Sequence, residues 1–330
     1  MEPQKRPSMT KTCQKSMKRI SGYRGIQLQK ARRPILFLAM LMSISLLIMA
    51  PCGKAISQTH SIKVVDDQEQ KITLTHPATR IIALYGAYNE ILAAMGLEDR
   101  LIGRTKTDVL PPSILTKPSI GTHMRPNIEL ILGLKPDLII QSAGRRDAML
   151  IVDQLRKEGL NVAVFHPANF DELFSVIKRL GILTGAEAGA DRLINSMQSR
   201  LQKIKHNLEN ITVRPKVFFE VRYPNLLGAG KGSIINDIIK KAGGINCIEN
   251  HKKLVRLGME ALIKRNPDVY IIQRGPMNKN PSHPAQRPHF QVLGAVMDSK
   301  ILMVDEQLFS RPGPRSVKAV EQLAAFLHPK

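Results

Sequence analysis

The chain has 330 residues, of which 43% are apolar and 23% are charged, and its formal net charge is +22. This length is enough for two domains with their own hydrophobic cores, and the composition is that of a globular protein. The positive charge is uneven: residues 1–55 carry a net +10 and the remainder +12, without a long Lys/Arg run or a nucleic-acid motif. We therefore expect no nucleic-acid partner.

The first 55 residues have the pattern of a secretory signal peptide. Basic residues up to Arg33 precede an apolar run, 34–50, and small residues that end at Ala55. This order directs export, and the apolar run is short for a membrane anchor, which is the alternative. Cys52 stands where a lipoprotein would carry its lipid, so attachment through Cys52 is a further alternative. We expect a periplasmic protein.

Cysteine usage indicates a fold without disulfides. After cleavage at Ala55 only Cys247 would remain, and a lone cysteine cannot form an intrachain disulfide. The sequence has no Cys/His spacing of the zinc type and no Ser or Cys with a His and an acid at a recognisable catalytic spacing. We expect no metal, no cofactor and no enzymatic activity.

Strands alternate with helices through residues 56–185. An alternating pattern around an acidic turn predicts a hairpin over 61–75. The short apolar run at 80–84 predicts a buried strand, followed by a helix that Asn89 would cap. A helix, strand, helix, strand and helix are then predicted at 127–133, 137–141, 145–158, 161–165 and 170–183. This alternation indicates an N-terminal α/β lobe with a mainly parallel sheet.

Residues 186–210 are predicted to form one long helix. Apolar residues recur there in steps of three and four, the helical period, at Leu193, Met197, Leu201, Ile204 and Leu208. About 24 helical residues would span roughly 36 Å, so the helix would connect two lobes stiffly. The alternative is an ordinary long helix within one domain.

Residues 211–330 resume the alternation and form the predicted C-terminal α/β lobe. Strands are predicted at 216–221, 268–272 and 301–304, and helices at 234–242, 259–265 and 316–327. The glycine-rich run 228–233 lacks the order of a phosphate-binding loop, and we interpret it as a loop at the cleft. The fold class is α/β: two lobes with mainly parallel sheets, joined by one long backbone helix.

A helix–Pro-Asp–strand unit occurs once in each half. Glu129 stands seven residues before Pro136, and Glu260 stands seven residues before Pro267. Each Glu falls in the first turn of a short helix, where the helix dipole favours a negative charge. Local helix chemistry would explain either Glu alone, whereas the matched pair favours two arginines of one partner.

The candidate ligand-binding residues follow the predicted strands, because ligands of open α/β sheets bind beyond the carboxyl ends of strands. These ends are rich in Arg and Tyr. The candidates are Tyr85, Tyr88, His123, Arg145, Arg222, Tyr223 and Arg311. Arg makes bidentate contacts to carboxylates and phosphates, and Tyr and His can ligate iron. The set favours an anionic ligand.

In this order, the features resemble the periplasmic solute-binding proteins of iron–siderophore, haem and vitamin B12 ABC importers, the class with a helical backbone. The resemblance covers about residues 62–330 and includes RPNIELILGLKPDLII, GMEALIKRNPDVYII and RPGPRSVKAVEQLA. It implies that the ligand lies between two lobes. It also implies that Glu129 and Glu260 dock onto arginines of the membrane permease.

The resemblance implies an exported, monomeric receptor that delivers an anionic metal chelate, with a ferric siderophore expected, to the permease of an ABC importer. Vitamin B12 binders carry a Trp where this chain has His123, and this chain has no Trp. A cobalamin receptor is therefore an alternative, as is a haem receptor using a Tyr or His123. A second alternative, from another class, is a chelatase-type enzyme.

Overall fold

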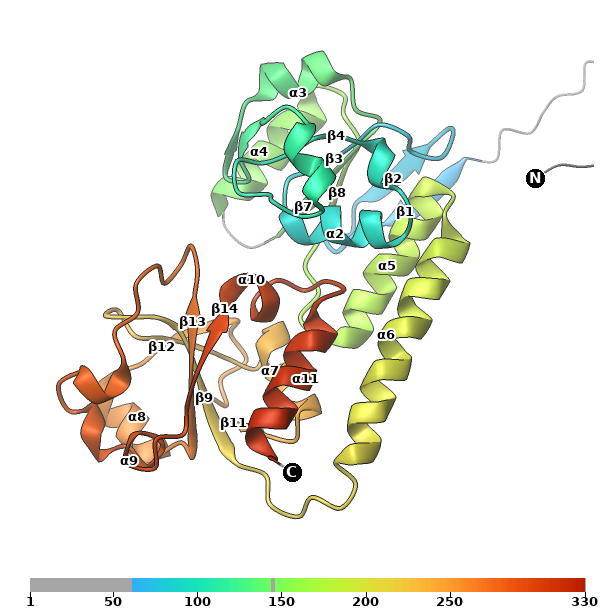
Figure 1. Cartoon of the computed structure of the whole chain (residues 1–330). Helices are drawn as coiled ribbons and strands as arrows, with labels where there is room; N and C mark the ends of the chain where they lie inside the picture. The colour runs from blue at the N-terminus through green and yellow to red at the C-terminus, as the bar shows by residue number, and fades with distance from the viewer. Residues whose placement is uncertain (1–60, 144–145, 330) are drawn as a thin grey trace, which may run out of the picture. The chain divides into compact units, whose positions relative to one another are not determined.

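The structure is a computed structural model that describes residues 61–143 and 146–329 (Figure 1). The predicted signal peptide and Arg145 lie outside these residues. All described residues belong to one unit of the chain, Thr59–Lys330. Among them, no helix combines the length and the apolar character that crossing a membrane requires.

The first sheet consists of four parallel strands in the order β4-β3-β7-β8. Its strands are β3 (Ile81–Ala83), β4 (Leu101–Gly103), β7 (Leu138–Ser142) and β8 (Val162–Phe165). Its helices are α2 (Gly86–Ala94), α3 (Ile128–Leu134), α4 (Arg146–Lys157) and α5 (Phe170–Thr184). Because strand side chains alternate between faces, Ile82 packs toward α3 and α4 and Ile81 toward α2 and α5. The predicted parallel sheet is confirmed.

Shorter elements surround this sheet. The predicted hairpin is present as an antiparallel pair. These elements are β1 (Ile62–Val65), β2 (Lys71–Leu74), η1 (Glu98–Arg100), η2 (Pro112–Thr116), β5 (Gly121–Thr122) and β6 (Arg125–Pro126). The predicted cap of the first helix is wrong, because α2 begins at Gly86 and Asn89 lies inside it. Asn89 is buried, and its side-chain amide donates to Asp108 at 3.0 Å.

The second sheet has the order β12-β10-β9-β13-β14, with β11 beside β9. The strands are β9 (Lys216–Arg222), β10 (Leu227–Ala229), β11 (Ile245–Asn246), β12 (Leu254–Arg256), β13 (Val269–Arg274) and β14 (Ile301–Asp305). The helices are α7 (Ile234–Lys241), α8 (Met259–Arg265), η3 (Pro284–Gln286), η4 (Phe290–Val292), α9 (Gly294–Met297), α10 (Glu306–Phe309) and α11 (Ser316–Leu327). Strands β9, β11, β13 and β14 pair in parallel, whereas β10 and β12 are antiparallel.

The glycine-rich run forms the predicted loop only from Gly230 onward. Its first residues belong to β10, and the turn that follows packs on the backbone of 250–252. A methyl group on Gly230 would lie 2.1 Å from the Lys252 carbonyl oxygen, and one on Gly232 would lie 2.3 Å from that of His251. The glycines therefore permit a close approach of two chain segments.

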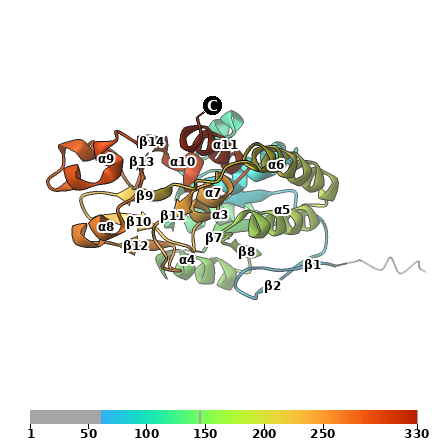
Figure 2. The ribbon, with the colours of Figure 1, turned by 90° about the horizontal axis from the view of Figure 1, so that it is seen from below.

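The long helix α6 (Glu187–Asn207) lies between the two sheets in sequence. Both views place it beside α5 (Figures 1 and 2). A methyl group on Gly181 of α5 would lie 2.9 Å from the Ala190 side chain, and one on Gly189 would lie 2.5 Å from the Met95 carbonyl oxygen. Further along, Arg200 forms a bidentate ion pair with Glu321 of α11, at 2.7 and 2.8 Å. Helix α6 thus contacts helices that cover each sheet.

The predicted helix–Pro-Asp–strand unit is present twice, as α3–β7 and α8–β13. Each helix has seven residues and ends at a left-handed residue, Lys135 with φ 49° and Asn266 with φ 36°. In each unit the Asp carboxylate accepts a hydrogen bond from a backbone N–H near the start of a neighbouring strand. Asp137 accepts from Thr79 N at 2.7 Å, and Asp268 from Lys216 N at 2.6 Å.

A buried ion pair holds the segment that follows β13. Arg287 is 1% exposed, and its guanidinium contacts the carboxylate of Glu220 on β9, which is 0% exposed. Arg287 also donates to the Ser282 carbonyl oxygen at 3.1 Å, and it stacks on Tyr223 with 4.0 Å to the ring centre. These contacts fix a segment whose first residues, 276 and 277, reach the cavity described next.

Candidate ligand-binding site

A cavity of about 300 Å³ lies at the carboxyl ends of strands from both sheets. The first sheet contributes residues after β3 and β4 and in the β5–β6 turn, and the second contributes residues after β13 and β14. Its polar lining includes Tyr85, Thr107, Asp108, His123, Glu306 and Arg311. This is where strand exits predict a ligand, and the volume is at the lower end of the roughly 300–1,000 Å³ of small-molecule sites.

Tyr85 and His123 form the aromatic part of the lining. Tyr85 ends the turn that leads from β3 into α2, and its ring centre lies 6.3 Å from that of His123, edge to face. The backbone carbonyl of His123 accepts from the buried Gln141 side chain at 2.9 Å, which holds the β5–β6 turn at the sheet. Two rings with polar tips therefore face one cavity.

The second sheet contributes a guanidinium and a carboxylate. Arg311 lies over the Tyr85 ring at 5.7 Å. Glu306, the first residue of α10, accepts from Met277 N at 2.7 Å. Gly86 leaves room for this arrangement, because a methyl group there would lie 2.7 Å from a carboxylate oxygen of Asp108 and 3.0 Å from Arg311.

Burial sets the protonation of several lining groups. It raises the pKa of Tyr85 to about 12, although Arg311 opposes the rise. Burial also raises the pKa of Asp108 and that of Glu306, against hydrogen bonds from Thr105 and Met277 respectively. Tyr85 is thus a neutral phenol at physiological pH, and ligation of iron by its phenolate would have to overcome this preference.

The structure brings together three of the seven predicted ligand residues: Tyr85, His123 and Arg311 all line the cavity. Tyr88 instead points into the core, where its hydroxyl donates to the Phe165 carbonyl oxygen at 2.6 Å and burial raises its pKa well above the usual range. Arg145 lies outside the described residues.

Arg222 and Tyr223 lie at the end of β9, away from the residues that line this cavity. The Arg222 Nε is buried without a hydrogen-bond partner among the described residues. Tyr223 packs on Arg287 and lines a separate cavity of about 400 Å³. Arg222 is the last residue of β9 and Tyr223 follows it, and neither lines the cavity that contains Arg311.

Sequence reasoning missed the two carboxylates of the lining. Asp108 lies in a Pro-containing loop that carries no motif, so the sequence had no signal for it. Glu306 directly follows β14, and the strand-exit rule could have found it. The described lining has one guanidinium and two carboxylates, which differs from the expected excess of Arg.

The two predicted docking residues are both exposed and both lie in the first turn of their helices. Glu129 is in α3 and Glu260 is in α8. Neither lines the cavity that contains Arg311. Each is therefore accessible to a second protein, from equivalent positions of the repeated unit.

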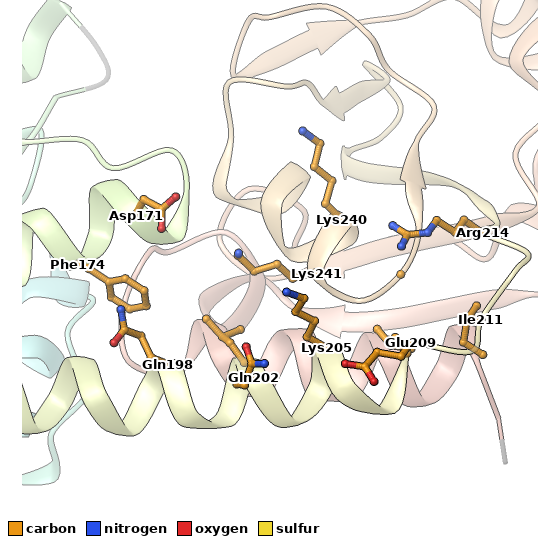
Figure 3. Close-up of a pocket in the computed structure, with 13 residues that line it drawn as sticks. Asp171, Phe174, Gln198, Gln202, Lys205, Glu209, Ile211, Arg214, Lys240 and Lys241 are labelled. Carbon is orange, nitrogen blue, oxygen red and sulfur yellow. The ribbon is translucent and has the colours of Figure 1, made fainter.

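A larger cavity, of about 630 Å³, lies along α6 and contains none of the predicted residues. Figure 3 shows its lining, which comes from α6 and the residues after it, the start of α5 and the end of α7. Lys205, Lys240 and Arg214 in this lining are exposed, as are Asp171 and Glu209. This mixture is typical of a solvated surface, whereas the cavity at the strand ends contains three of the predicted ligand residues.

No cluster of three His, Cys, Asp or Glu side chains suited to a metal ion occurs within the described residues. The periplasmic binding protein family model matches residues 81–324. The chain belongs to this family. It is a binding protein and not an enzyme, which sets the chelatase alternative aside. The match spans both sheets and every residue that lines the cavity.

Relatives of this periplasmic binding protein cover most of its length. An uncharacterized ABC transporter substrate-binding lipoprotein of Bacillus subtilis is 28% identical over 85% of this chain and 93% of its own. A vitamin B12-binding protein of Vibrio cholerae is 26% identical over 76% of this chain and 90% of its own length. The crystal structure of a possible iron-binding, periplasmic solute-binding protein of Staphylococcus epidermidis has a TM-score of 0.66 and 28% identity, covering 77% and 100%.

Proposed function

We propose that this protein is the exported substrate-binding protein of an ABC importer, which receives a metal chelate in the cavity between its two sheets and delivers it to a membrane permease. The observation that carries this proposal is the cavity itself: strand ends of both sheets line it, and it contains Tyr85, His123 and Arg311. The substrate-binding relatives and the family support it.

In this proposal the chain has two α/β lobes, residues 56–185 and 211–330, connected by the helix at 186–210. The contacts of α6 with α5 and α11 support a stiff connection. A helix has no loop hinge to absorb a large change of backbone angles, so lobe closure should be small. The receptor would act as a monomer.

The proposed ligand is an iron chelate of the siderophore type. An Arg and two rings in one cavity support a chelate with polar groups around an apolar body. Cobalamin is the alternative favoured by the vitamin B12-binding relative. Haem is a further alternative, with His123 or Tyr85 as the iron ligand. The cavity holds only part of such ligands, so the rest of the ligand would extend beyond the strand ends.

The proposed docking residues are Glu129 and Glu260, received by arginines of the permease through bidentate ion pairs. Their exposure and their equivalent helix positions support this role. Export would depend on residues 1–55, with Cys52 as the site of any lipid; the Bacillus subtilis relative is a lipoprotein.

Binding and uptake test the proposal together. The purified chain is titrated with ferric siderophores, haemin and cobalamin, followed by Tyr fluorescence because the chain has no Trp. Saturable binding of one chelate is expected, and silence with all of them would overturn the function. The double variant Glu129→Ala/Glu260→Ala should bind as tightly as wild type yet abolish uptake in a strain that lacks the chromosomal copy. Loss of affinity in that variant would place these residues at the ligand instead.

A further inference from the structure

Two carboxylates enter the cavity from different sheets. Asp108 follows β4 of the first sheet and is 2% exposed, and Glu306 follows β14 of the second sheet and is 6% exposed. Both line the cavity that contains Arg311. A ligand held between the strand ends would therefore meet both carboxylates.

Each carboxylate has one oxygen engaged by the protein. Oδ2 of Asp108 accepts from Thr105 N at 2.8 Å and from the Asn89 side chain at 3.0 Å. Oε2 of Glu306 accepts from Met277 N. The Thr105 hydroxyl also acts on the Asp108 carboxyl group, and no other donor among the described residues reaches Oδ1 of Asp108 or Oε1 of Glu306. Two acceptor atoms are thus fixed in place and available to a ligand.

The single guanidinium of the described lining compensates them only in part. The charge of Arg311 lowers the pKa of both carboxyl groups, but Arg311 makes no ion pair within 4.0 Å to a carboxylate among the described residues. Burial raises the pKa of each carboxyl group despite Arg311 and the hydrogen bonds, so loss of water destabilises the ionised form in the cavity. A donor or cation supplied by a ligand would compensate them.

We propose that Asp108 and Glu306 determine ligand specificity: they select a chelate that turns an ammonium or primary amide group into the cavity, and they disfavour one that turns a carboxylate there. This inference rests on the proposed function of the cavity. The physical reason is that N–H donors form charge-assisted hydrogen bonds to buried carboxylates, whereas a ligand carboxylate would face two like charges and a single guanidinium, that of Arg311.

The test uses ligand pairs that differ in one group. Ferrioxamine B is a ferric trishydroxamate with one ammonium group, and its N-acetyl derivative is the same chelate without that charge. Cyanocobalamin and its monocarboxylic acid, in which one peripheral amide is hydrolysed, form the second pair. The full-length chain, kept in mild detergent because of the apolar segment 34–50, is titrated calorimetrically with all four compounds and with ferric enterobactin, which is triply anionic, and haemin.

Wild type should bind the ammonium or amide member of a pair at least about tenfold more tightly than its partner, the change expected for one charge-assisted hydrogen bond. Asp108→Asn and Glu306→Gln, examined separately, should each reduce this ratio toward one. Asp298→Asn, an exposed carboxylate on α9's end, is the matched control and should keep the wild-type ratio. Thermal unfolding shows whether each variant is folded. If only one of Asp108→Asn and Glu306→Gln folds, that variant alone is enough to test the inference.

Three outcomes would contradict the inference while leaving the proposed function in place. Equal or tighter binding of the acetylated or carboxylic acid member by wild type would overturn it, and so would an unchanged ratio in a folded variant. Tight binding of ferric enterobactin or haemin alone would keep the proposed function and overturn the inference. Absence of binding by every compound would instead reject the proposed function, and the inference with it.

Discussion

The buried pair between Arg287 and Glu220 offers a sharp test of what holds the second sheet and the segment after β13 together. Nη2 of Arg287 donates to Oε1 of Glu220 at 3.1 Å, its Nη1 contacts Oε2, and Tyr270 donates its hydroxyl to the same carboxylate. Arg287→Met keeps much of the side-chain volume but leaves Glu220 as an unpaired charge in a fully buried position.

The expected loss follows from that burial. Removing one partner of a buried ion pair costs about 3–5 kcal/mol, a large part of the roughly 5–15 kcal/mol by which a domain is stable. The pair between Arg200 and Glu321 has comparable bidentate distances, but each side chain is 40% exposed. Arg200→Met should therefore cost less than about 1 kcal/mol.

Urea unfolding followed by far-ultraviolet circular dichroism measures both losses. The double variant Arg287→Met/Glu220→Gln should recover part of the loss of Arg287→Met, because no buried charge remains. Equal destabilisation by Arg287→Met and Arg200→Met would refute the reasoning. A double variant that is less stable than Arg287→Met would also contradict it.

Further predictions concern four single positions. Gly189→Ala should cost about 1–3 kcal/mol in urea unfolding, because its methyl group would lie 2.5 Å from the Met95 carbonyl oxygen. A methyl group on Gly133 would have no atom within 4 Å, so Gly133→Ala should leave the free energy of unfolding unchanged or raise it by up to about 1 kcal/mol. Equal effects of Gly189→Ala and Gly133→Ala would contradict this. Burial raises the pKa of Cys247 to about 12. At pH 8 the Cys247 thiol should therefore react with iodoacetamide roughly a thousandfold more slowly in the folded chain than in urea. In the folded chain the rate should rise only as the pH approaches 12. Gly86→Ala should weaken chelate binding at least about tenfold by crowding the cavity, and calorimetry showing unchanged affinity would remove this position from the site.

Periodicity predicted the fold well because it reports local burial. The stripe from Leu193 to Leu208 gave the long helix to within a few residues at each end, and the repeated Pro-Asp unit located two helix–strand pairs. Helix entry was harder to predict. Asn89 has the chemistry of a cap, but α2 already begins at Gly86 and uses Asn89 to hold Asp108.

The site was predicted only in part, because a strand-exit rule locates an edge of a sheet and not the direction of a side chain. Tyr85 and Tyr88 are three residues apart, and the helix turns Tyr88 into the core while Tyr85 faces the cavity. Asp108 and Arg311 come to line one cavity only through tertiary folding across 203 positions of sequence. Pattern and spacing carry no signal for such a meeting of distant segments.

The α3–β7 and α8–β13 units each carry a Glu in the first turn of the helix. The residues that line the cavity, in contrast, differ between the two sheets. Under the proposed docking role, a partner made of two identical subunits can receive the receptor in either of two orientations related by half a turn. Ligand transfer would then be independent of which subunit meets which lobe. Single substitutions at Glu129 and at Glu260 should consequently impair uptake to the same degree, an equality that recognition through one lobe would not produce.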